Sequence, residues 1–507
     1  MMAALPSHIS QNPATYKQAT TETTRITHQA KTRVILIVNE EKPLIWSFGL
    51  YMWTLLYLLV VGLVIYLILT RRRGQQGGWI AASVFVNGTV LIAEVDEDYV
   101  CATMDWGPPG GTTSLLDLDL NNVILQNAVE AFSPLKIRMG GTLQDNVVYQ
   151  TTVDVEQQKP CSHFVPNQQH MFQFDQGCLP LSRWDQLNDF FNRTGALVTF
   201  GLNALAGRSI NSLGTAVGDW NFTNAKSLMR YTVDKGYKIL GWELGNELSG
   251  NGIGTRIPAS QYALGVSALQ SLVDDIYNGF DTKPLVIAPG GFFDATWFAE
   301  FVGSAIESVQ VITHHIYNLG QGTDNHIEDK ILNPSYLNGE ARVFSLLQGI
   351  INNSKSSAVA WVGEAGGAAQ GGRNHVTNAF LMNFWYLDQL GMAASYNTKT
   401  FCRQTLIGEH YGLLNTSSFL PNPDYYSALL WHQLMGTRVL STTPYGTNEL
   451  RAYAHCSKQS QGFALLFLNL DRGQEVRVSL STENGMITSQ QSKNNGHGSK
   501  FSEQTRR

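Results

Sequence analysis

The chain of 507 residues has few charged side chains: Asp, Glu, Lys and Arg make up 15% of it, and the formal net charge is −5. It contains no basic patch or Lys/Arg-rich tract of the kind that indicates a nucleic-acid partner. It has no repeat of fixed period, which argues against a repeat architecture. The apolar fraction of 43% is typical of a globular protein, and the length suffices for one large domain with smaller accessory parts.

Motifs for metals and cofactors are also missing. The glycine pairs 366–367 and 371–372 lack the Gly-Lys-Ser/Thr ending of a phosphate-binding loop, so we expect them to bring backbone close to a ligand instead. His314 and His315 are adjacent, so on a strand they point to opposite faces, and no third ligand has a suitable spacing. The sequence therefore predicts no metal and no cofactor, with one His lining a pocket and the other packed behind its strand.

Cysteine is scarce and odd in number. The five residues are Cys101, Cys161, Cys178, Cys402 and Cys456, so at least one stays unpaired within a monomer. Cys161 and Cys178 flank a loop-like stretch, which makes them the expected disulfide. The alternative is a reduced, buried pair.

Residues 44–70 are uncharged and strongly apolar, which predicts a transmembrane helix. The stretch is too long and too far from Met1 for a signal-peptide core, and a buried core helix is the alternative. Arg25, Lys31, Arg33 and Lys42 precede it and Arg71, Arg72 and Arg73 follow it, which slightly favours a cytosolic N-terminus. That orientation predicts a membrane-anchored protein whose remainder is extracellular or luminal.

Asn-X-Ser/Thr sequons agree with this placement, although each short pattern also arises by chance. The five predicted glycosylation sites are Asn87, Asn192, Asn221, Asn352 and Asn415.

A regular alternation of strand-like and helix-like segments fills the middle of the chain. Strand-like runs end at 105–106, 138–141, 200–203, 243–247, 288–290, 314–317, 362–364 and 403–404. Amphipathic helical patterns lie at about 121–132, 182–192, 222–236, 259–278, 295–306, 336–352, 375–390 and 424–435. Eight strands and eight helices predict an α/β fold, a (β/α)8 TIM barrel over residues 99–436. A doubly wound sheet is the competing fold, but it seldom needs so regular a count.

The flanking regions differ in pattern from the barrel. We expect a disordered tail over 1–43, a linker over 71–82 and a further disordered tail over 486–507. Strand-like runs at 450–456, 463–470 and 475–480 predict a small C-terminal β-sandwich over 437–485, short enough to lack strands. A strand over 83–98, with Asn87-Gly88 as a turn signal, is expected to join that domain.

Two glutamates end two of the strand-like runs. Residues 242–247 read WELGNE and residues 360–364 read AWVGE, which places Glu247 at the fourth strand end and Glu364 at the seventh. Active sites of these barrels lie at the C-terminal strand ends, so the carboxylates should face each other. A retaining glycosidase needs one protonated and one ionised carboxyl about 5–5.5 Å apart. We therefore predict Glu247 as general acid/base and Glu364 as nucleophile.

Neighbouring residues have predicted supporting roles. Asn246 is placed to hydrogen-bond a sugar hydroxyl, and Tyr317 to donate its hydroxyl to Glu364. Glu243 shares a strand face with Glu247 and is the alternative acid. Most acids in such short motifs are solvated loop residues. The prediction of a catalytic site therefore rests on Glu247 and Glu364 together and not on either motif alone. Candidates for stacking on sugar, of which we expect two in the cleft and the rest in the core, are Trp106, Trp242, Trp361 and Tyr411.

These motifs resemble those of a known family. Residues 242–250 (WELGNELSG), 313–320 (THHIYNLG), 361–367 (WVGEAGG), 384–391 (FWYLDQLG) and 421–431 (PNPDYYSALLW) are similar to plant heparanase-like proteins of glycoside hydrolase family 79, whose members act on β-glucuronides. The resemblance runs from about residue 84 to 480 and implies a barrel with a β-sandwich and a retaining mechanism that uses Glu247 and Glu364. It also implies that Gly371, Gly372 and Tyr411 bind the glucuronate carboxylate. Further pocket positions implied in this way are Asp105, Thr142 and Gln404.

The chain departs from the family pattern at Glu409, where a small residue is common; an anion facing the pocket would repel a uronate. Family members normally begin with a cleavable signal peptide, which the expected anchor replaces here. The leading hypothesis is a retaining hydrolase of β-glucuronide linkages in glycans or proteoglycans. The alternatives are a retaining hydrolase of a neutral xyloside or arabinoside, or a catalytically silent glycan-binding protein.

Overall fold

The computed structural model describes residues 79–107, 114–459, 461–483 and 485–487. The expected N-terminal tail (1–43) and transmembrane helix (44–70) lie outside the described residues, as do most of the linker (71–82) and of the C-terminal tail. Among the residues that are described, no helix has the length and apolarity needed to cross a membrane.

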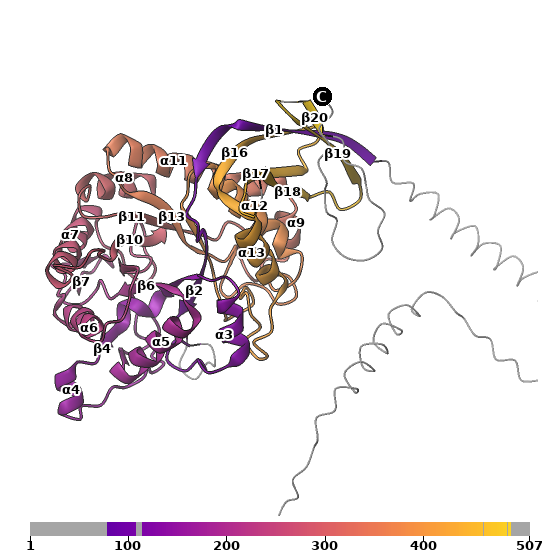
Figure 1. The fold of residues 1–507 in the computed structure, drawn as a ribbon. Helices are drawn as coiled ribbons and strands as arrows, with labels where there is room; N and C mark the ends of the chain where they lie inside the picture. Colours follow the sequence, from indigo (N-terminus) through magenta and orange to yellow (C-terminus); the bar gives the residue numbers. More distant parts are fainter. Residues whose placement is uncertain (1–78, 108–113, 460, 484, 488–507) are drawn as a thin grey trace, which may run out of the picture. The chain divides into compact units, whose positions relative to one another are not determined.

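Eight parallel strands close into a barrel, which confirms the predicted architecture (Figure 1). In chain order they are β2 (Val100–Asp105), β3 (Lys136–Gly140), β6 (Leu197–Leu202), β9 (Gly241–Leu244), β10 (Leu285–Phe292), β11 (Val311–Ile316), β13 (Val359–Ala365) and β15 (Thr400–Arg403). Nearly all of their residues are buried, because side chains fill the interior and helices cover the exterior. All eight strands lie where the sequence predicts them.

Eight helices follow these strands. They are α3 (Val123–Glu130), α5 (Leu181–Thr194), α6 (Thr223–Asp234), α7 (Ala259–Ile276), α8 (Ala295–Ser304), α11 (Gly339–Ser354), α12 (Met382–Ser395) and α13 (Pro423–Leu434). The helix expected over 336–352 is instead two, because α10 (Pro334–Leu337) ends before Asn338. The helix expected from 375 begins only at Met382, since His375 has a left-handed φ of 61° that a right-handed helix excludes.

The barrel closes where its last strand, β15, pairs with its first, β2. Cys402 and Cys101 are partners in that register and form a disulfide across 301 positions. The sequence analysis missed this pair, because only barrel closure brings the two strands together. Cys161 and Cys178 are bonded as well, and Cys456 is free.

Small elements that the sequence analysis did not predict build up the loops. The segment between β3 and α5 contains the 3-10 turn η1 (Thr142–Asn146), β4 (Val147–Tyr149), α4 (Thr152–Glu156) and β5 (Gly177–Leu179). The remaining ones are β7 (Ser209–Ile210), β8 (Ala216–Val217), β12 (Gly320–Gln321), β14 (Ala368–Ala369) and α9 (Ile327–Ile331). β12 pairs with β14, which joins the loop after Tyr317 to the glycine-rich segment after Glu364.

A six-stranded sheet combines the first described strand with the C-terminal region. Its strands are β1 (Trp79–Glu94), β16 (Met435–Tyr445), β17 (Leu450–Ser457), β18 (Phe463–Asn469), β19 (Glu475–Thr482) and β20 (Gly485–Ile487), in the order β18-β17-β16-β1-β19-β20. β1 pairs antiparallel with β16 and parallel with β19, so the strand before the barrel does join this domain. Within the described residues the domain is this one sheet.

Three boundaries in this sheet differ from the expected ones. β1 begins at Trp79, inside the expected linker, because residues 79–82 pair with β19. Asn87-Gly88 does not form a hairpin turn; β1 continues past it with an irregular register between Asn87 and Leu91. β20 extends two residues into the expected C-terminal tail by pairing with β19.

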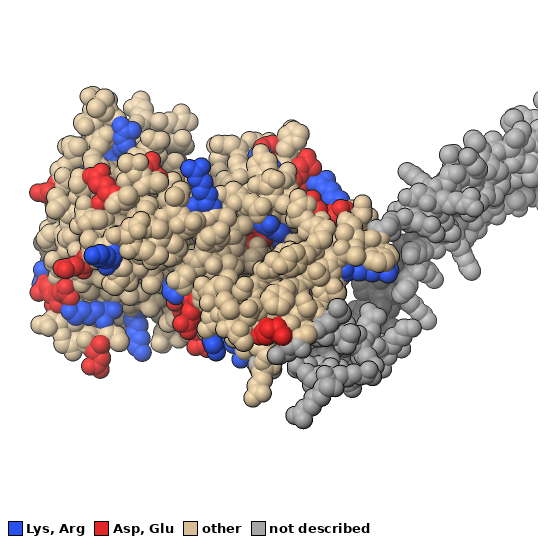
Figure 2. Space-filling view, turned by 90° about the horizontal axis from the view of Figure 1, so that it is seen from above, with Lys and Arg blue, Asp and Glu red and all other residues tan. Residues whose placement is uncertain are grey.

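A buried ion pair joins the barrel to the sheet. Asp388 on α12 is fully buried and accepts hydrogen bonds from Arg451 Nε at 2.6 Å and Tyr453 Oη at 2.6 Å, both on β17. A Cβ at Gly391, one helical turn on, would lie 2.3 Å from the Tyr453 ring. Elsewhere charges are dispersed: on the face shown in Figure 2, acidic and basic side chains are scattered among each other.

We predict that Asp388→Ala lowers the free energy of unfolding by about 3–5 kcal/mol, because it leaves the Arg451 charge buried without its partner. Urea unfolding followed by tryptophan fluorescence measures this. The matched control is Asp275→Ala, which breaks the exposed pair with Lys226 and should cost less than about 1 kcal/mol. Equal losses in the two variants would contradict the proposed role of the joint.

Candidate active site

A tight turn after β9 delivers Glu247 to the mouth of the barrel. The chain turns through Gly245 at φ 70° and Glu247 at φ 56°. A Cβ at Gly245 would lie 2.9 Å from Ala204 Cβ, so the turn requires glycine there. The Glu247 backbone N–H donates to the Gly290 carbonyl at 2.7 Å, which secures a φ that residues with side chains seldom adopt.

Glu364 lies in β13, and its side chain is held by hydrogen bonds. Tyr317 Oη donates to Oε1 at 2.5 Å, and Arg138 Nη1 donates to Oε2 at 2.8 Å. Burial alone would raise the pKa of Glu364. The charges of His315 and Arg138, with the bond from Tyr317, outweigh burial and lower that pKa below its usual value. The Glu364 carboxyl is therefore ionised at neutral pH.

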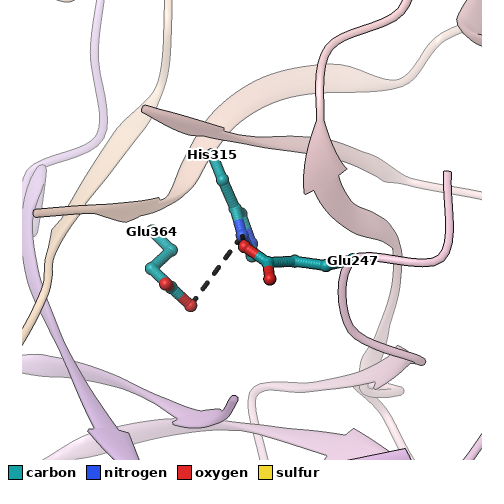
Figure 3. A group of neighbouring side chains, drawn as sticks. All are labelled: Glu247, His315 and Glu364. Carbon is teal, nitrogen blue, oxygen red and sulfur yellow. Dashed lines mark hydrogen bonds and ion pairs between the residues drawn. The ribbon is translucent and has the colours of Figure 1, made fainter. Parts of the chain in front are cut away.

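The two glutamates point toward each other, with His315 beside them (Figure 3). His315 Nδ1 lies 3.0 Å from Glu247 Oε1 and 3.8 Å from Glu364 Oε2. One oxygen of each carboxylate and one ring nitrogen of His315 all lie within 4.8 Å of one another. The predicted pair from the fourth and seventh strands thus shares one small space.

Arg138, on β3, is a central residue of the site that the sequence analysis missed. Its guanidinium donates from Nε to Glu243 at 2.7 Å, from Nη1 to Glu364 at 2.8 Å, and from Nη2 to the side-chain oxygen of Asn246 at 2.8 Å. The only signal in the sequence is a strongly charged residue within a short buried strand, Lys136–Gly140.

Glu243, the alternative acid, lies deeper in the barrel and has no exposed surface. Arg138 binds one of its oxygens and Thr313 Oγ1 donates to the other at 3.0 Å. Both oxygens are therefore engaged away from the mouth, and Glu243 is not placed to protonate a leaving group. The assignment of Glu247 remains.

Asp145, in η1, is a second residue that the sequence analysis missed. It accepts the backbone N–H groups of Ala204 and Asn246, each at 2.7 Å. Burial raises the pKa of Asp145 to about 7, and those two hydrogen bonds oppose the shift. This side chain ties the loop after β3 to the ends of β6 and β9, and so fixes the backbone that precedes Glu247.

A pocket of about 250 Å³ borders the end of β13: its lining residue Gln404 donates its backbone N–H to the carbonyl of Ala365, next to Glu364, although neither glutamate lines it. Four of the residues implied by resemblance line it, namely Asp105, Thr142, Gln404 and Tyr411. Gln404 Nε2 donates to Asp105 Oδ2 at 2.6 Å, and Thr103 bonds the oxygen of the same amide. Burial, together with the Glu364 charge, raises the pKa of Asp105 to about 7. Asp105 Oδ1 has no hydrogen-bond partner among the described residues.

Gly371 and Gly372 lie against the same loop as Tyr411. A Cβ at Gly372 would lie 3.2 Å from the Tyr411 ring, and the Gly371 carbonyl accepts the His410 N–H at 2.8 Å. Both glycines have positive φ, 78° and 74°. Glu409 also lines the pocket, as its sequence position suggested.

The candidate aromatic and histidine residues divide between pocket and core. Trp106 and Tyr411 line the pocket, whereas Trp242 is buried against Phe200 and Trp361 packs on Lys136. His314 is buried behind its strand against Phe344. Burial lowers its pKa to about 3, so it stays neutral.

The cluster of Glu247, His315 and Glu364 is the one group among the described residues whose ligand atoms could together hold a metal ion. Arg138 already donates to the Glu364 oxygen, and this cation disfavours a second positive charge at that place. The absence of a metal stays a prediction.

The five sequon asparagines all have surface to which a glycan could be attached. Four are exposed, and Asn87 in β1 is partly exposed. Their glycosylation also stays a prediction.

Comparisons with known proteins place the chain. The family model described as "Glycosyl hydrolase family 79, N-terminal domain" matches residues 81–391. Heparanase-like protein 3 of Arabidopsis thaliana is 54% identical over 411 residues, covering 79% of this chain and 76% of that protein. Baicalin-beta-D-glucuronidase of Scutellaria baicalensis is 46% identical over 413 residues, covering 77% of each.

Solved structures support the fold alone. A GH51 arabinofuranosidase from Xanthomonas axonopodis pv. citri aligns with a TM-score of 0.60 and 14% identity, over 81% of this chain and 89% of that one. A 4-O-alpha-L-rhamnosyl-beta-D-glucuronidase from Fusarium oxysporum aligns with a TM-score of 0.54 and 17% identity, over 79% of this chain and 84% of that one. The family match and the two plant relatives show that the chain is a member of glycosyl hydrolase family 79, a glycosidase related to the heparanases and to baicalin β-glucuronidase.

Proposed function

We propose that this protein is a retaining β-glucuronidase that acts on glucuronic-acid-bearing glycans or proteoglycans. The observation that carries the mechanism is the closeness of Glu247 and Glu364, whose nearest oxygens lie within 4.8 Å. Retaining enzymes hold their carboxyl groups about 5–5.5 Å apart, while inverting enzymes leave about 6.5–9.5 Å for a water molecule. The short spacing favours direct attack by a side chain.

In the first step the Glu364 carboxylate attacks the anomeric carbon while the Glu247 carboxyl gives its proton to the leaving oxygen. A covalent ester between sugar and Glu364 forms as the glycosidic bond breaks. In the second step Glu247, now a carboxylate, takes a proton from water, and the resulting hydroxide displaces Glu364. Arg138 and Tyr317 keep Glu364 ionised and oriented before attack. Arg138 also holds the Asn246 amide by its oxygen, which leaves its NH2 group to donate to a sugar hydroxyl.

The glucuronide part of the proposal is supported by relatives. Baicalin-beta-D-glucuronidase is named for this activity, and so is the more distant hyaluronoglucuronidase of Hirudo nipponia, which is 25% identical over 389 residues. The backbone at Gly371 and Gly372, beside the Tyr411 hydroxyl, is the proposed seat of the uronate carboxylate. A neutral xyloside or arabinoside is the second candidate, because no Lys, Arg or His is among the residues that line the pocket.

We predict that Glu247→Gln lowers kcat about 10²–10⁴-fold on an aryl β-glucuronide with a poor leaving group, and much less on the dinitrophenyl glycoside, which departs without a proton. Glu364→Gln removes the nucleophile and should abolish turnover of both. The matched control is Glu300→Gln on the exposed side of α8, which should change neither. Initial rates on the aryl β-glucuronides, β-xyloside and α-arabinofuranoside measure this, and glycan binding without any turnover would support the silent alternative.

We predict that the first product released is the β-anomer, since two displacements restore the configuration. Proton NMR of the anomeric signals during the first minutes of reaction measures this. First release of the α-anomer would exclude the double displacement.

We predict that kcat/KM for the glucuronide falls as pH rises through about 7. Burial and the charge of Glu364 raise the pKa of Asp105 to about 7, so its carboxyl is neutral at lower pH. At higher pH this carboxyl ionises and adds a negative charge near Glu364 and the bound uronate. In Asp105→Asn the fall of kcat/KM with rising pH should disappear or move to higher pH, whatever the absolute rate. The pH dependence of kcat/KM, measured for the wild type and for Asp105→Asn, checks this prediction. If kcat/KM of the variant falls over the same pH range as that of the wild type, a group other than Asp105 causes the fall.

We also propose that residues 44–70 anchor the protein with its catalytic part outside the cytosol. The full-length protein should then stay with membranes after carbonate extraction, and its mass should fall on treatment with peptide N-glycosidase at the predicted sequons. Release of the protein by carbonate would contradict the membrane anchor. An unchanged mass after glycosidase treatment would contradict the placement of the catalytic part outside the cytosol.

A further inference from the structure

The charge of the pocket beside the glutamates is one-sided. Its ionisable lining residues are Asp105, Glu409 and Tyr411, with no Lys, Arg or His among them. The remaining walls are mainly apolar or aromatic, with Trp106, Phe172, Phe174, Leu143 and Ile407. A ligand in this pocket therefore meets acidic side chains, and no basic side chain among the described residues lines it.

The pocket lies on the glycone side of the reaction centre. Gln404, which lines the pocket, donates its backbone N–H to the carbonyl of Ala365 at 3.0 Å, so the pocket borders the strand end that carries Glu364. Glu364 attacks the anomeric carbon, whereas the leaving group departs beside Glu247. The part of the substrate that enters the pocket is therefore the sugar that becomes bound to Glu364, together with any group it carries.

Glu409 places its carboxylate where that sugar would be recognised. A Cβ at Gly371 would lie 2.6 Å from Glu409 Oε2, so the carboxylate rests directly against the glycine-rich backbone. Glu409 holds a left-handed φ of 51°, and its side chain forms no hydrogen bond or ion pair with any described residue. No basic side chain among the described residues pairs with this carboxylate, which lines the pocket.

We propose that Glu409 is a specificity-determining residue that disfavours an ionised carboxylate on the glycone, so that a uronide whose carboxyl is esterified is a better substrate than the free acid. This inference rests on the proposed β-glycosidase activity and names its substrate class more closely. Two like charges within a few ångströms repel each other, while an ester of similar shape keeps the polar contacts and carries no charge.

The test compares 4-methylumbelliferyl β-glucuronide with its methyl ester, using the full-length protein at pH 6. The leaving group is the same, so the ratio of the two kcat/KM values reports the glycone pocket. The wild type should favour the ester. Glu409→Gln should raise kcat/KM for the free acid about tenfold and change that for the ester less than about twofold. In the wild type, added salt should narrow the difference between ester and acid, since salt screens the repulsion.

Two further variants complete the design. Glu409→Asp keeps the charge and should keep the wild-type ratio, and Glu300→Gln removes an equal charge from the exposed side of α8 and should leave the ratio unchanged. An unchanged ratio in Glu409→Gln, or a loss of activity on the free acid alone, would overturn the inference while leaving the glucuronidase intact. If the wild type turns over neither the free acid nor the ester, the proposed function itself is overturned.

Discussion

The interaction on which the active site depends is the buried guanidinium of Arg138. It holds Glu243 beneath the site, Glu364 within it and the Asn246 side chain at its edge. Removing such a group would leave carboxylates buried without a partner, which is far more costly than losing a surface pair. One cation thus fixes the geometry of strands β3, β9 and β13 relative to one another.

That single cation cannot balance all the acids around it. Glu243, Glu247, Glu364, Asp105 and Asp145 gather at one end of the barrel. The charges of His315 and Arg138 help to lower the pKa of Glu364 against the effect of burial, whereas burial raises the pKa of Asp105 and of Asp145 to about 7. Acids that are not bonded to a cation therefore keep their protons to higher pH, and the site contains ionised and neutral carboxyl groups at one pH. A retaining mechanism needs one ionised carboxyl as nucleophile, and the lowered pKa of Glu364 fits that role.

The sequence predicted the parts of this arrangement that follow a local pattern. Strand ends are visible as apolar runs followed by Gly, Asn or Glu, and they located all eight strands as well as Glu247 and Glu364. Arg138, Asp145 and the Cys101–Cys402 disulfide have no such pattern. Arg138 lies 105 positions from Glu243, and the cysteines lie 301 apart, so only the closed barrel makes them neighbours. Boundaries were missed where a backbone angle decides them, as at His375.

The loops carry what the barrel does not determine. Glu409 is exposed and lies between β15 and α13, so its side chain contributes little to packing and can change without cost to the fold. Arg138, by contrast, cannot be replaced without disturbing three other residues. The buried network constrains the chemistry, while in our proposal the choice of substrate depends on side chains such as Glu409 that line the pocket. On this proposal, two members with the same glutamates differ in the glycone they accept through one exposed charge.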